Sequence, residues 1–122
     1  MHVAEDNLRR AWKAGVPLVT GSDAGNTLVF HGPTVHRELQ LWVAAGIPPT
    51  VALQAATRNA AQLLGAGSRL GLVAPDYDAT LLVVDGDPTH EISSTERISM
   101  VIFQGERVRR AELFDPAKNP LK

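Results

Sequence analysis

Apolar and polar positions recur with a helical period in the first half of this chain of 122 residues. The pattern predicts helices over residues 3–14, over residues 34–45, and over the alanine-rich stretch 50–64. Gly15 follows the first of these stretches as a helix terminator. Residues 16–20 form a short apolar run that contains β-branched side chains, which predicts a buried strand.

The second half of the chain changes to short apolar runs separated by turn residues. Residues 71–73, 79–84 and 98–103 predict strands, because proline, aspartate and glycine bound them. A tight turn at residues 104–107 leads into a last predicted strand at Val108. We therefore predict three parts of the chain, listed by residue: an α/β part over 1–65, a β part over 66–112, and a polar tail over 113–122.

Composition places the chain among ordinary globular proteins, with 44% hydrophobic and 20% charged residues. The formal net charge of −1 gives no long-range attraction to nucleic acid or to an anionic membrane, so we expect neither as a partner. The sequence has no cysteine, which excludes disulfides and thiolate metal sites. The polar, acidic stretch 1–6 does not resemble a secretory signal, and we expect a cytoplasmic protein.

Asp23 is the first candidate for chemistry. It lies in a glycine-rich loop directly after the predicted strand 16–20. In α/β barrels the catalytic residues stand at the carboxyl ends of strands, so this position suits a functional carboxylate. The alternative is that Asp23 only caps a turn, as aspartate often does, and Asp23 taken alone favours that alternative. Ser22 has no base at a readable spacing, so a serine nucleophile is disfavoured.

Several short motifs follow one another in a fixed order. They are Gly21-Ser22-Asp23-Ala24-Gly25, His31-Gly32, Glu38-Leu39, residues 44–49, residues 52–61, Leu63-Leu64-Gly65 and residues 81–88. Together this order resembles the amidohydrolase superfamily, particularly its imidazolonepropionase-like and prolidase-like branch. Each motif alone is weak, but the resemblance runs from about residue 3 to about residue 110.

The resemblance implies an α/β fold: the last strand and helices of a (β/α)8 barrel, plus strands of a small adjoining β-sandwich. It matches Asp23 to the aspartate of the eighth barrel strand, which binds a divalent metal and takes the proton from the metal-bound water. The implied metal is zinc, as one or two ions. His31 and Asn26 are then candidates for substrate binding, although His31 could equally be a locally hydrogen-bonded loop residue. We expect His36, Arg37 and Glu38 to form a solvated or barrel-rim helix face.

The chain also departs from the family pattern. It has no His-x-His pair, and a catalytic zinc site takes about three protein ligands. A whole barrel takes about 250 residues. We therefore expect the C-terminal segment of an enzyme that hydrolyses C–N bonds in small amides, cyclic amides or dipeptide-like substrates, inactive as this segment alone. The rival hypothesis is a noncatalytic remnant or assembly module. In either case we expect a homo-oligomer or association with the missing barrel portion.

Overall fold

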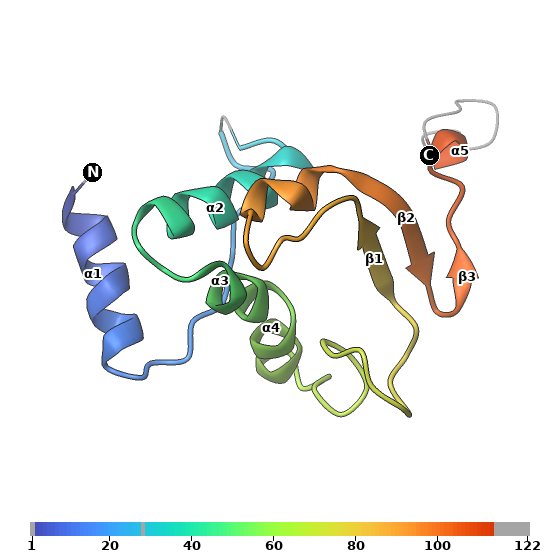
Figure 1. Cartoon of the computed structure of the whole chain (residues 1–122), viewed down its shortest axis with the longest axis horizontal. Helices are drawn as coiled ribbons and strands as arrows, with labels where there is room; N and C mark the ends of the chain where they lie inside the picture. The colour runs from blue at the N-terminus through green and yellow to red at the C-terminus, as the bar shows by residue number, and fades with distance from the viewer. Residues whose placement is uncertain (1, 28, 114–122) are drawn as a thin grey trace.

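A computed structural model describes residues 2–27 and 29–113 (Figure 1). Four helices are found among the described residues of the first half: α1 (His2–Lys13), α2 (Pro33–Ala44), α3 (Pro49–Ala56) and α4 (Arg58–Leu63). The predicted helices over residues 3–14 and 34–45 are confirmed by α1 and α2. No helix among the described residues is long and apolar enough to cross a membrane.

The predicted single helix over residues 50–64 is wrong at one position. Thr57 separates α3 from α4, with backbone angles of φ −125° and ψ −87° that lie outside the helical region. Its hydroxyl donates a hydrogen bond to the Leu53 carbonyl at 2.7 Å. Threonine often competes with the helical backbone in this way. The break at Thr57 turns α4 relative to α3. The alanine-rich sequence pattern does not predict this break.

The apolar run 16–20 forms no strand in the structure. Its groups bond instead to the neighbouring helices: Asn59 Nδ2 donates to the Leu18 carbonyl at 2.9 Å, and the Thr20 amide approaches the Ala55 carbonyl at 3.5 Å. A strand exists only when a second strand pairs with its backbone. No strand among the described residues pairs with this run, so the predicted strand remains an unpaired segment packed beside α3 and α4.

As far as residue 113, the second half forms one antiparallel sheet of three strands in the order β1-β2-β3. The strands are β1 (Leu81–Val84), β2 (Ile98–Phe103) and β3 (Glu106–Arg107). β1 and β2 confirm the strands predicted over residues 79–84 and 98–103. The sequence predicts the last strand at Val108, and β3 lies just before that residue. The predicted strand over residues 71–73 is wrong, because those residues are irregular and pair with no other strand.

The hairpin between β2 and β3 has the expected tight turn. Phe103 pairs with Glu106, so the loop consists of Gln104 and Gly105 alone. Both have positive φ, 51° and 85°, which is the conformation of a two-residue turn that matches the twist of the strands. Gln104 therefore tolerates a backbone conformation that glycine adopts more easily.

A hydrophobic core cluster joins the two halves. Leu39 of α2, Ala52 of α3 and Ile92 of the short 3₁₀ helix η1 (Ile92–Glu96) are buried together, and Trp42 and Leu53 pack against them. Figure 1 shows η1 lying along α2. The core thus combines residues from both sides of residue 65. It holds α2 in place, and α2 follows the loop that carries Asp23.

The last described helix is α5 (Arg110–Leu113), and the predicted tail lies outside the described residues from residue 114 onward.

Candidate active-site loop

The loop between the unpaired segment and α2 carries all three predicted site residues. Asp23 is exposed and has a positive φ of 50°. Aspartate is one of the few residues that adopt this left-handed conformation at modest cost. The backbone therefore reverses at Asp23, and the carboxylate lies at the surface of the loop.

Asn26 contacts Asp23 directly. Its Nδ2 donates a hydrogen bond to Asp23 Oδ2 at 3.0 Å, while its Oδ1 accepts the Thr27 amide at 2.8 Å. The Asn26 amide N–H also approaches the Asp23 carbonyl at 3.3 Å. Both ends of the Asn26 side chain are therefore occupied inside the loop. In this geometry Asn26 orients the Asp23 carboxylate, and the predicted contact between Asn26 and substrate stays a prediction.

His31 closes over the same loop. A Cβ placed on Gly25 would lie 3.2 Å from His31 Nε2, so the imidazole packs against the bare backbone of this glycine. Gly25 has a φ of 99°, and its amide donates to the Val29 carbonyl at 2.9 Å. The loop thus brings His31 close to Gly25, two residues after Asp23. The roles predicted for Asp23 and His31 remain predictions.

The helix face predicted to be solvated or to lie at the barrel rim is only partly solvated. Arg37 is exposed, but His36 and Glu38 are half-buried and hydrogen-bonded. His36 Nδ1 lies 3.1 Å from Thr95 Oγ1, and Glu38 Oε1 accepts the Gly21 amide at 3.0 Å. The helical spacing in the sequence indicates the partial burial of His36, because His36 lies three residues before the buried Leu39 and shares its face.

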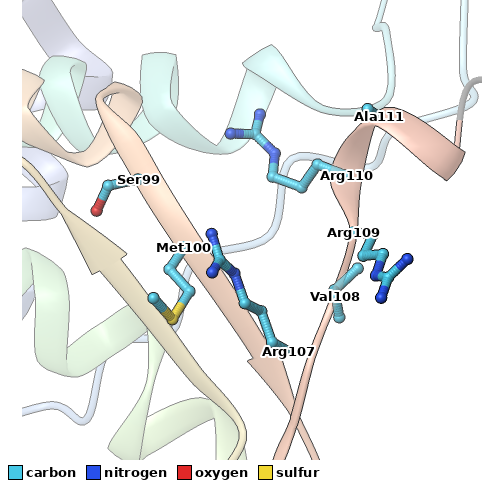
Figure 2. A pocket seen from close by; sticks show the side chains of 7 residues that line it. All are labelled: Ser99, Met100, Arg107, Val108, Arg109, Arg110 and Ala111. Carbon is cyan, nitrogen blue, oxygen red and sulfur yellow. The ribbon is translucent and has the colours of Figure 1, made fainter.

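A separate hollow lies between β2 and the chain that follows β3. It is lined by Ser99, Met100 and residues 107–111 (Figure 2). Arg107 and Arg110 lie on the side toward β2, whereas Arg109 turns to the opposite side. Arg110 Nη1 donates to the Ile98 carbonyl at 3.0 Å. The three guanidinium groups do not converge on one point, and the hollow includes none of the predicted site residues.

Comparison with known proteins identifies the family. Residues 3–108 match the family described as the amidohydrolase family. The chain belongs to the amidohydrolase family. Its sequence is 37% identical over 86 residues to an adenine deaminase of Geobacillus kaustophilus (strain HTA426), a match that covers 70% of this chain and 15% of that protein.

Solved structures agree with this amidohydrolase assignment. A Xaa-Pro dipeptidase with bound methionine in the active site is 34% identical, with a TM-score of 0.78 over 85% of this chain. A putative prolidase from Bifidobacterium longum is 36% identical, with a TM-score of 0.80 over 87% of this chain. The chain spans only 25% and 26% of those two structures. The resemblance to prolidase-like amidohydrolases is confirmed, and the mixed helix and strand content fits a fragment of that fold.

Members of the amidohydrolase family generally bind divalent metals. The described residues contain no group of three or more His, Cys, Asp or Glu side chains that could hold a metal ion. Asp23 offers one carboxylate donor, and a catalytic zinc site takes about three protein ligands. The described part of this amidohydrolase chain therefore does not fit a complete metal centre by itself.

Proposed function

We propose that this chain is the C-terminal segment of a metal-dependent amidohydrolase that breaks a C–N bond in a small amide, cyclic amide or dipeptide-like substrate. The observation that carries the proposal is the exposed Asp23 carboxylate on its reversed loop, in a chain of this family. The names of the relatives support the bond type, since deamination of adenine and cleavage of a Xaa-Pro dipeptide both break a bond between carbon and nitrogen.

The proposed role of Asp23 is proton transfer. Its Oδ2 accepts one hydrogen bond, from Asn26, and no other hydrogen bond to the carboxylate is found among the described residues. The remaining lone pairs are available to take a proton from the attacking water and to return it to the leaving nitrogen. His31, beside Gly25, is the proposed substrate contact, and Asn26 orients the carboxylate.

The proposed cofactor is a divalent metal, zinc, for which Asp23 would supply one ligand. A bound metal lowers the pKa of its water and polarises the substrate carbonyl. Because the described residues supply too few ligands, the others would come from outside them. The isolated chain should then bind zinc weakly and hydrolyse nothing.

The test compares residues 1–122 with the intact enzyme that contains this segment. Both are stripped of metal, reconstituted with zinc, and assayed with Xaa-Pro dipeptides, adenine and a small cyclic amide. We expect hydrolysis of one class by the intact enzyme and none by the isolated chain. Hydrolysis of none of them by the intact enzyme would count against the proposed reaction. Stoichiometric zinc binding with turnover by the isolated chain would show that its metal site is complete.

The unpaired segment 16–20 favours a second candidate, an assembly module. A run of apolar chain whose backbone has no strand partner invites pairing with another chain. Its partner would be a second copy or the rest of a barrel. Light scattering at micromolar concentration should then give a mass above that of one chain. A clean monomer, with the amides of residues 18–20 protected from hydrogen exchange, would contradict this candidate.

A further inference from the structure

Glu38 links α2 to the start of the loop that carries Asp23. Its Oε1 accepts the Gly21 amide N–H at 3.0 Å, across 17 residues of sequence. Gly21 is the last residue before the Ser22-Asp23 step, so this bond holds the backbone two residues ahead of the candidate carboxylate. It ties the entry of the loop to α2, which the core cluster in turn holds through Leu39.

Among the described residues, the other hydrogen bonds around Asp23 stay inside the loop, and the next bond to α2 comes only at the exit of the loop, where the Thr34 hydroxyl donates to the Phe30 carbonyl. Asn26 bonds to Asp23 and to Thr27, and Gly25 and Val29 bond across the reversal. Internal bonds of this kind preserve the shape of a loop but do not set its place relative to the helices. The hydrogen bond from the Gly21 amide to Glu38 holds the start of the loop in place relative to α2.

The second carboxylate oxygen of Glu38 shows that stability alone does not explain this residue. Glu38 Oε2 is buried and has no hydrogen-bond partner among the described residues. A buried oxygen without a donor costs free energy, and native proteins carry few of them. An apolar side chain at this helix position would avoid that cost. At this position the unpaired Glu38 Oε2 is unfavourable, while Glu38 Oε1 makes the hydrogen bond to the Gly21 amide.

We infer that Glu38 is a positioning residue for Asp23, acting through the hydrogen bond between Glu38 Oε1 and the Gly21 amide. The inference rests on the proposed function for its effect on catalysis, but the contact itself can be tested without any activity. A side chain that acts in this way should affect the chemical step and leave substrate binding almost unchanged. A shift of about 1 Å in a reacting group can cost about 100-fold in rate.

Two substitutions separate the hydrogen bond from the charge. Glu38→Gln removes the charge but keeps an oxygen that can accept the Gly21 amide. Glu38→Met has a similar length and also lacks the charge, but its thioether sulfur is only a weak acceptor. Gln40→Met is the matched control on the same helix, because it loses the 2.6 Å hydrogen bond from Gln40 Nε2 to Glu96 Oε1, and among the described residues the Gln40 side chain has no hydrogen bond to the loop.

The first measurement uses the 122-residue chain and NMR-detected hydrogen exchange at the Gly21 amide. We expect exchange roughly 3- to 10-fold faster in Glu38→Met than in Glu38→Gln, the factor that one net hydrogen bond contributes. Gln40→Met should leave the Gly21 amide as in the wild type. Equal exchange in the two Glu38 variants would overturn the inference, whatever reaction the enzyme performs.

The second measurement uses the intact enzyme. We expect kcat of Glu38→Met to fall by roughly 10- to 100-fold with KM changed by less than about 3-fold, and Glu38→Gln to recover most of the loss. Glu38→Met with full kcat, in an enzyme that Asp23→Asn inactivates, would overturn the inference while leaving the proposed function intact. An inactive wild type would instead overturn the proposed function, and the exchange measurement would then decide the inference.

Discussion

Two aspartate loops in this chain have opposite hydrogen-bonding states. Asp87, in the loop between β1 and η1, accepts the Thr89 amide at 2.9 Å and the Thr89 hydroxyl at 2.6 Å on Oδ1. Its Oδ2 lies 2.8 Å from His90 Nδ1. Asp23, in the loop before α2, accepts a hydrogen bond on its side chain from Asn26 alone among the described residues.

The hydrogen bonds to Asp87 make its carboxyl group more acidic. The hydrogen bonds from the side chain and amide of Thr89, followed by that from His90, lower the pKa of Asp87 from 3.8 to about 2. Its donors come from the next three residues, in the local turn that aspartate commonly forms. A carboxylate whose oxygens are occupied in this way supports a turn. Among the described residues, no hydrogen bond reaches Asp23 Oδ1, and a carboxylate needs such an open oxygen in order to bind a metal or accept a proton.

The largest expected effect is on turnover. In the intact enzyme, Asp23→Asn should lower kcat by several orders of magnitude, because asparagine cannot carry a proton between water and the leaving nitrogen. Asp87→Asn is the matched control, an identical substitution in the other loop, and should keep turnover near that of the wild type. The measurement is steady-state hydrolysis, with bound metal and thermal melting recorded on the same samples.

Asparagine replaces aspartate well in a turn or a cap. Near wild-type turnover of Asp23→Asn at full metal occupancy would therefore place Asp23 beside Asp87 as a turn residue and remove the contrast between the two loops. A loss of activity matched by loss of metal would show that ligation is the main role of Asp23.

A smaller effect is expected from a methyl group added in each loop. Gly86 has a φ of 100°, and a Cβ there would lie 2.5 Å from Arg97 Nη2 and 2.9 Å from the buried Ser94 Oγ. Gly86→Ala should lower the free energy of unfolding by about 2–3 kcal/mol, combining backbone strain with displacement of these groups. Gly25→Ala meets only the His31 ring, at 3.2 Å from Nε2 and 3.5 Å from Cε1, and should cost about 1–2 kcal/mol.

Urea unfolding of the two alanine variants measures this order. Because the methyl group at Gly25 displaces the His31 ring, Gly25→Ala should also raise KM in the intact enzyme, whereas Gly86→Ala should not. Equal stability losses in the two variants would mean that the packing around Gly86 is looser than its contacts indicate.

The smallest effect is a pH dependence at Asp87. The pKa of this carboxyl is lower in the folded chain than its ordinary value, so its ionised form stabilises the fold above about pH 3.8, and that stabilisation is lost as the pH falls through about 2. The group is exposed and solvent screens it, so the change in melting temperature between pH 5 and pH 2 should be small. NMR titration of the Asp87 carboxyl should give a midpoint near 2, moving toward 3.8 in Thr89→Ala. An unchanged midpoint in that variant would show that Thr89 is not the main cause.

The sequence by itself determined the elements whose hydrogen-bond partners are near in the chain. The first two helices, β2 and the turn at Gln104–Gly105 appear where the patterns predict them, because a helix bonds within four residues and a tight hairpin pairs adjacent segments. β1 also appears where its apolar run predicts a strand, although its partner β2 lies 14 to 21 residues further along the chain. The ordered motifs around Asp23 also indicate the family without any knowledge of contacts, because motif order is a property of the sequence alone.

Tertiary structure alone decided what depends on distant partners. Residues 16–20 have the pattern of a strand but pair with no strand in the described part of the chain, because a strand needs a neighbour that the pattern cannot supply. The sequence likewise gave no sign that Glu38 would reach Gly21, since the two lie 17 residues apart and meet only after α2 packs against α3 and η1. A local pattern reports which face of an element is apolar. It does not report which backbone amide a polar side chain on that element will meet.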